Sequence, residues 1–353
     1  MTKPFLALLF VYCLSFHYAK AEDKDLSKYY EYVHKANIEI VEKDLRKAEV
    51  YFDSAFKVIT HPFYIDINNA LYVQVNKDNP NKEKITVYLK MLQKKGLCVH
   101  EEYERRERFK PFLSLVPESD CKSVIDTNAR AVVRQAIKTD QEVRNRSYEK
   151  YKEVYHPSML PEIRRADETN YKSVIQILKL AEKRNIGLED LIGSSAYYSL
   201  STVILHNAAV GRCDQALLRK LAQKGVLESR LTSRELDDYC FRFLKCGSEY
   251  GRYGTSALRL TMNKAFVLVP SKVLGDSITS ARSQIYLQDF IEESKLRAFA
   301  WFNAKYGIKT GGYAVEAIGS EEDNKDLESR LRTITKDIII YEKKEDFDFD
   351  RKK

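Results

Sequence analysis

Apolar residues recur at helical spacing along residues 188–209, and the stripe that they form ends in polar side chains. Its apolar members are Ile192, Ala196, Leu200 and Val203. This spacing places them on one face of a helix, and the same face continues to His206 and Asn207. A helix that only packs against a core needs no polar groups at such positions. The pattern therefore predicts a helix that carries a polar site at its end.

A second helical pattern covers residues 32–56, with a polar break at residues 42–44. Its apolar members are Ala36, Ile40, Leu45, Ala48, Phe52, Ala55 and Phe56. The segment resembles a tetratricopeptide repeat through four positions that alternate large and small residues, Leu45, Ala48, Phe52 and Ala55. A weaker copy follows at about the 34-residue period of that repeat, over residues 65–96. A plain helical hairpin explains the same pattern, and both interpretations stay open at this point.

A third helix is expected to begin near Ser123, with an apolar face formed by Val133, Ala136 and Ile137. Three polar residues continue along that face at helical steps, Asp140, Gln141 and Arg144. Asp140 and Arg144 are four residues apart, so they form either a solvated surface pair or a carboxylate held by a guanidinium in a cleft. Their position on the apolar stripe favours the second interpretation.

Further polar residues follow in order along the chain: Asp167 with Asn170, Gly193, His206, Asp237 with Asp238, and Tyr253-Gly254-Thr255. With the preceding trio they resemble the landmarks D-Q-x-x-R, D-x-x-N, Q-H-A-D, D-R and Y-G-T-Q of a domain of unknown function that occurs in many exported bacterial proteins. The resemblance covers residues 123–295. It implies a helical domain and supplies positions for a site, but no established activity.

The chain departs from these landmarks at four places. A G-W-P element is replaced by Asn185-Ile186-Gly187, and Q-H-A-D is replaced by Leu205-His206-Asn207-Ala208. The final element ends in Ser256, and the D-R position reads Asp237-Asp238-Tyr239. If the family domain is catalytic, these departures imply an impaired site or a changed role in this chain.

Each polar candidate has a structural alternative. His206 is either a core histidine or a general base, and as a base it needs a carboxylate such as Asp140 or Asp237 to orient its ring. Asp167 and Asn170 fit a helix cap better than a site. The catalytic candidates are His206, Asp140, Arg144 and Tyr253, and the binding candidates are Gln141, Asn170, Asn207, Asp237 and Thr255.

The pattern as a whole predicts an all-α fold, in which tetratricopeptide-like helical hairpins pack on a second mainly helical domain. Residues 265–269 form a short strand or a loop, and helix returns over residues 281–302. The expected organisation is a signal peptide at 1–21, the hairpins at 22–96, a connector at 97–122, the helical domain at 123–302 and an extension with a charged tail at 303–353.

The first 21 residues have the features of a cleaved secretory signal, because Lys3 precedes the apolar run FLALLFVYCLSF and the small-x-small sequence Ala19-Lys20-Ala21. We therefore expect a secreted or periplasmic protein without a later membrane span. Removal of Lys3 and Lys20 lowers the net charge from +8 to +6, and the remaining basic residues are interleaved with acidic ones. Nucleic acid is not expected as a partner, because its binders concentrate basic residues on one face.

The cysteines that remain after cleavage are odd in number: Cys98, Cys121, Cys213, Cys240 and Cys246. A bridge between Cys98 and Cys121, and one among the last three, are both open, while the absence of C-x-x-C spacing argues against zinc. The sequence has no H-E-x-x-H or G-x-S-x-G motif, and no cofactor is predicted.

Two functions remain from different classes. The first is an exported protein-interaction module that binds a protein or peptide through the helical hairpins. The alternative is a small-ligand-binding or hydrolase-like enzyme with a polar site around His206. The two differ in one geometric property, which is whether the side chains of His206, Asp140, Arg144 and Tyr253 converge.

Overall fold

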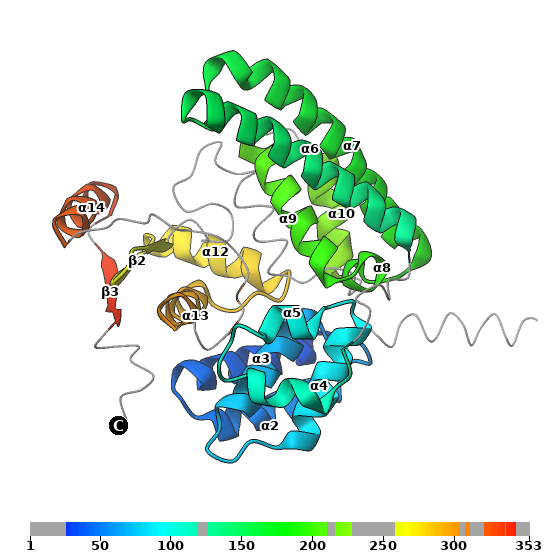
Figure 1. Ribbon diagram of the computed structural model, residues 1–353. Helices are drawn as coiled ribbons and strands as arrows, with labels where there is room; N and C mark the ends of the chain where they lie inside the picture. Colours follow the sequence, from blue (N-terminus) through cyan, green and yellow to red (C-terminus); the bar gives the residue numbers. More distant parts are fainter. Residues whose placement is uncertain are drawn as a thin grey trace, which may run out of the picture.

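The computed structural model describes residues 26–118, 126–209, 216–227, 258–303, 308, 310, 321–335 and 337–343. These residues are mainly helical, as the sequence pattern predicts, and a small antiparallel sheet accompanies the helices (Figure 1). No helix in this part of the chain combines the length and hydropathy that a bilayer crossing requires. The predicted signal peptide at residues 1–21 lies outside the described residues.

Two successive helical hairpins open the described chain. Their helices cover residues 26–41, α2 (Leu45–Ala55), α3 (Tyr64–Asn76) and α4 (Lys82–Lys94). The predicted polar break is a turn in which Lys43 has a φ of 64° and the carboxylate of Asp44 accepts the backbone N–H of Lys47 at 3.0 Å. The side chain caps α2, since it accepts from an N–H that has no partner within the helix. Tetratricopeptide-like packing of these hairpins stays a prediction.

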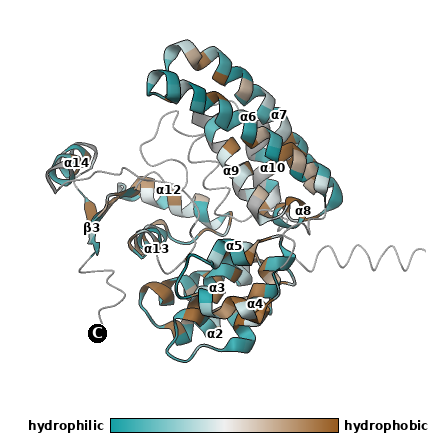
Figure 2. Ribbon diagram, in the orientation of Figure 1, coloured by the Kyte–Doolittle hydropathy of each residue, from teal (hydrophilic) through white to brown (hydrophobic). Residues whose placement is uncertain are grey.

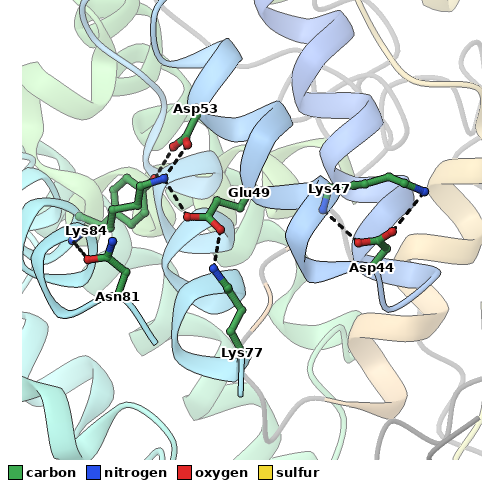
Figure 3. A network of polar contacts seen from close by, with 8 residues as sticks. Asp44, Lys47, Glu49, Asp53, Lys77, Asn81 and Lys84 are labelled. Atoms are coloured by element: carbon green, nitrogen blue, oxygen red, sulfur yellow. Dashed lines mark hydrogen bonds and ion pairs between the residues drawn. The ribbon is translucent and has the colours of Figure 1, made fainter. Parts of the chain in front are cut away.

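Ion pairs join α2 to the helices that follow it (Figure 3). Glu49 pairs with Lys77, which follows α3, and its other oxygen lies 2.8 Å from the ammonium of Lys84 on α4. The same ammonium pairs with Asp53, one turn further along α2. Burial by itself raises the pKa of the Glu49 carboxyl, but hydrogen bonds from Lys77 and Lys84 outweigh burial and lower this pKa to about 2.

The first hydrophobic core combines these hairpins with residues near the other end of the chain. After α4 come α5 (Val99–Tyr103) and the 3-10 helix η1 (Lys110–Leu115), which add the buried rings of Tyr103 and Phe109. Phe266 and Phe299, from the second half of the chain, belong to the same core.

The C-terminal part of that core contains the sheet. Its elements are β1 (Leu258–Leu260), β2 (Lys264–Leu268), α12 (Lys272–Ser283), α13 (Phe290–Phe302), α14 (Glu321–Ile334) and β3 (Ile338–Glu342). Both strand pairs are antiparallel in the order β1-β2-β3, so residues 265–269 are mainly strand rather than loop. The prediction of one helix over residues 281–302 is wrong, because Tyr286 has a φ of 58° and Asp289 caps a new helix at Phe290.

The second hydrophobic core lies among the helices in the middle of the chain. Its elements are α6 (Thr127–Tyr151), η2 (Pro157–Met159), α7 (Leu160–Arg184), α8 (Leu188–Ile192), α9 (Ser194–Ala209) and α10 (Ala216–Leu227). The long helices α6 and α7 lie side by side, and α9 packs against both (Figure 1). Figure 2 colours much of α6 and α7 as hydrophilic, which agrees with core contact along one face only.

The predicted helix over residues 188–209 is interrupted at Gly193. This residue has a φ of 81° and separates α8 from α9. The predicted apolar stripe still lies in the core, with Ile192, Ala196, Leu200 and Val203 all buried.

A buried ion cluster connects the two cores. Lys95, directly after α4, lies 3.3 Å from a carboxylate oxygen of Glu189 and 3.1 Å from one of Asp190, both on α8. The same Glu189 carboxylate accepts the backbone N–H of Tyr64 at 2.8 Å. The carbonyl of Lys95 in turn accepts the hydroxyl of Ser194, at the start of α9, at 2.8 Å. These bonds fix the beginning of α9 against the first hairpins.

Candidate functional site

Polar residues from three helices of the second core lie together where the apolar stripes end. On α6, the buried positions Ala129, Val133 and Ala136 lead at helical spacing to Asp140 and Arg144. Asp167 and Asn170 occupy buried positions on α7, and His206 lies near the end of α9. Because α6, α7 and α9 pack together along their apolar faces, the polar ends of those faces meet.

Asp140 is the centre of this cluster and has no exposed surface. Its Oδ1 atom accepts from Nη1 of Arg144 at 2.8 Å. Its Oδ2 atom accepts from Nε2 of Gln141 at 2.8 Å and lies 2.6 Å from Nδ1 of His206. An ionised carboxylate only accepts hydrogen bonds, so Nδ1 of the imidazole carries the proton in this contact.

Arg144 connects two carboxylates. Besides Asp140 it donates from Nη2 to Oδ1 of Asp167 at 2.9 Å, and its guanidinium carbon lies 5.6 Å from the centre of the Tyr155 ring. Burial disfavours the charged guanidinium, but the charges of Asp140 and Asp167 outweigh burial and raise the pKa of Arg144. The arginine therefore stays charged, and the interpretation of Asp140 and Arg144 as a solvated surface pair is wrong.

The sequence pattern does not predict Asp167 as a member of the cluster, because its spacing to Asn170 fits a helix cap. That interpretation is wrong, since α7 begins at Leu160 with Pro161 in its first turn, and Asp167 lies well inside the helix. A signal was present in the sequence: Asp167 and Asn170 continue the heptad-like spacing of the buried residues Ile163, Val174 and Ile177.

Several atoms of the cluster have no hydrogen-bond partner in the described part of the chain. They are Oδ2 of Asp167, Nδ2 of Asn170 and Nε of Arg144. Asp167 is 3% exposed and Asn170 is 1% exposed, so bulk water does not satisfy these groups. Burial raises the pKa of the Asp167 carboxyl, and the nearby Arg144 opposes this effect.

The structure brings His206, Asp140, Arg144 and Gln141 together and places Asn170 beside Asp167, to which Arg144 is bonded. His206 and Gln141 are the partly exposed members of the group, and the side chain of His206 is 22% exposed. The backbone of Asn207 lies in α9, but its side chain is not among the described groups. Three predicted residues lie outside the described residues, Tyr253, Asp237 and Thr255.

The described residues include a disulfide-bonded cysteine but no candidate metal site. No group of three or more His, Cys, Asp or Glu residues in the described ranges is arranged to hold a metal ion. Cys98 is disulfide-bonded, and its partner lies outside those ranges. No family model, curated protein or solved structure matches the chain.

Proposed function

We propose that the cluster around His206 binds a small polar ligand and transfers a proton, as in a hydrolase-like enzyme. The observation that carries this proposal is the 2.6 Å contact between Nδ1 of His206 and the buried carboxylate of Asp140. The carboxylate fixes the tautomer in which Nε2 has a free lone pair. A neutral imidazole held in this way accepts a proton from a substrate or from an attacking water molecule.

The surroundings of Asp140 favour proton transfer over a purely structural role. Arg144 and Gln141 both donate to the carboxylate, so Asp140 is held in place for its contact with the imidazole of His206. Asp167 and Asn170 each retain an unpaired atom beside this network, so polar atoms remain there that could bind a ligand.

We also propose that the chain is exported and related to the domain of unknown function that its landmarks resemble. This proposal is supported by the contacts among four of the landmark residues, Asp140, Gln141, Arg144 and His206, which lie together in the fold although His206 is far from the others in the sequence. The disulfide of Cys98 supports export, since disulfides persist in oxidising compartments. The protein-interaction module predicted from the hairpins stays a prediction.

An activity screen tests the proton-transfer proposal. The full chain is incubated with p-nitrophenyl acetate, acetyl-p-nitroanilide and p-nitrophenyl phosphate, and release of the chromophore is measured. We expect His206→Ala to reduce turnover of at least one compound by about a hundredfold or more, the usual contribution of a general base. His61→Ala, at an exposed histidine outside the cluster, is the matched control. Equal rates for wild type and His206→Ala on all three compounds contradict the proposal.

A further inference from the structure

The unpaired atoms of α7 form a complementary couple. Asp167 and Asn170 are three residues apart on the helix, so their side chains project from the same face. Oδ2 of Asp167 is a hydrogen-bond acceptor in the ionised form, which Arg144 favours by donating to Oδ1. Nδ2 of Asn170 is a donor. Both atoms are buried and have no partner among the described residues, so the face offers one acceptor and one donor to a ligand.

The charges of the cluster limit what that ligand is. The described cluster has two carboxylates, Asp140 and Asp167, but one guanidinium, and both terminal nitrogens of Arg144 are already bonded to those carboxylates. Two carboxylates already face the single guanidinium, so an entering phosphate or carboxylate would add a further negative charge beside the Asp167 oxygen. A buried negative charge without a partner is strongly unfavourable.

We propose that the ligand is an uncharged primary carboxamide, bound through Asp167 and Asn170. A primary amide carries its carbonyl oxygen and one N–H on the same side, so the oxygen accepts from Nδ2 of Asn170 while this N–H donates to Oδ2 of Asp167. In a trans secondary amide the two groups point in opposite directions. This inference rests on the proposed function and names its substrate class. A phosphate ester offers no N–H for Asp167, and a carboxylate brings a second negative charge.

A carboxamide bound in this way could be hydrolysed by water. Nε2 of His206 takes a proton from water, the water oxygen bonds to the carbonyl carbon, and Asn170 stabilises the negative charge that develops on the carbonyl oxygen. The C–N bond then breaks, and the proton passes from His206 to the departing nitrogen. The products are a carboxylic acid and ammonia, and water is the second reactant.

Binding measurements test this inference without relying on turnover. Ligand-observed NMR titrations of the full chain use acetamide, acetate and inorganic phosphate as probes. We expect acetamide to bind and the two anions to bind at least about tenfold more weakly, which matches the loss of one hydrogen bond to a charged group. Tighter binding of acetate or phosphate overturns the carboxamide inference, and so does undetectable binding of acetamide.

Two substitutions connect the binding to the named atoms. Asp167→Asn and Asn170→Leu are each expected to weaken the binding of acetamide by about tenfold, while Asp276→Asn on the exposed face of α12 leaves it unchanged. Asn170→Leu replaces a buried amide, whose Nδ2 atom is unpaired, by an apolar group of similar shape, so the fold is expected to keep or increase its melting temperature. Unchanged amide affinity in folded Asn170→Leu overturns the inference.

The binding test and the activity screen fail separately. If phosphate or ester turnover depends on His206 while acetamide does not bind, the proton-transfer proposal stands and the carboxamide inference is wrong. If acetamide binds through Asn170 but no turnover depends on His206, the site is a carboxamide-binding site and the proton-transfer proposal is wrong.

Discussion

The Nδ1 atom of His206 lies 2.6 Å from Oδ2 of Asp140, although the two residues are 66 positions apart in the sequence. The carboxylate is fully buried, whereas the imidazole reaches the surface. The two residues therefore have different roles, because Asp140 orients the imidazole while the ring of His206 remains available to a ligand.

Replacement of the acid tests this division. We expect Asp140→Asn to lower the free energy of unfolding by about 3 kcal/mol, because it removes one partner of a buried ion pair with Arg144. Any turnover that depends on His206 should fall as well, since an amide side chain does not fix the required tautomer. Urea denaturation and the chromogenic screen measure the two effects. An unchanged unfolding free energy contradicts the buried pairing, with Asp276→Asn as the exposed control, expected to stay within about 0.5 kcal/mol.

Periodicity predicted the polar cluster where side chains share a stripe with apolar neighbours. Asp140, Arg144 and His206 follow Val133 and Val203 at helical steps, so their convergence required only that the apolar faces of α6 and α9 meet. Asp167 resembles a helix cap when only the residues after it are considered. It lies inside α7, because that helix already begins at Leu160.

Long-range assembly was beyond the sequence pattern. The pairing of Lys95 with Glu189 joins positions 94 residues apart, and neither residue has a local signal that sets it apart from the many surface charges. Phe52 and Phe299 belong to one core, and this shared core could not be predicted either. A pattern of apolar residues predicts which face of a helix is buried but not which element packs against it. Tyr286, with its φ of 58°, broke a helix that periodicity alone continued.

Gly193 tests the backbone break between α8 and α9. Its φ of 81° and ψ of 149° lie in a region that essentially only glycine occupies. We expect Gly193→Ala to lower the free energy of unfolding by about 1 to 3 kcal/mol, measured by urea denaturation. Gly275→Ala is the matched control, because Gly275 lies inside α12 and an added Cβ would meet the ring of Pro270 at 3.7 Å, an ordinary van der Waals distance. There we expect a gain of about 0.5 to 1 kcal/mol, and an equal loss at both glycines would contradict the argument.

The lowered pKa of Glu49 predicts that the protein loses stability in acid. Its pKa is lowered from 4.5 to about 2 in the folded protein, so the folded state favours the ionised form. The stabilisation is therefore present above pH 4.5 and is lost as the pH falls towards 2. We expect Glu49→Gln to be less stable than wild type by about 1 kcal/mol at pH 7 and to approach it near pH 2. Urea denaturation at several pH values checks this, with Glu149→Gln at an exposed position of α6 as control. A pH-independent difference would contradict it.

The ion pairs of Lys95 with Glu189 and Asp190 provide a test of how the two cores are joined. The charges of Glu189 and Asp190 outweigh the burial of Lys95 and raise its pKa, so its contribution is complete below pH 10.5 and declines as the pH rises through the folded value. Lys95→Met leaves a buried Glu189 carboxylate without its cation, and we expect the free energy of unfolding to fall by about 3 kcal/mol at pH 7.

Glu189→Gln should recover part of that loss when it is combined with Lys95→Met, because the uncompensated charge is then gone while the amide oxygen can still accept from Tyr64. Urea denaturation of both single variants and the double variant measures the coupling. Additive losses would mean that Lys95 and Glu189 do not interact, and the α8 contact would then hold the cores together through Ser194 and apolar packing alone.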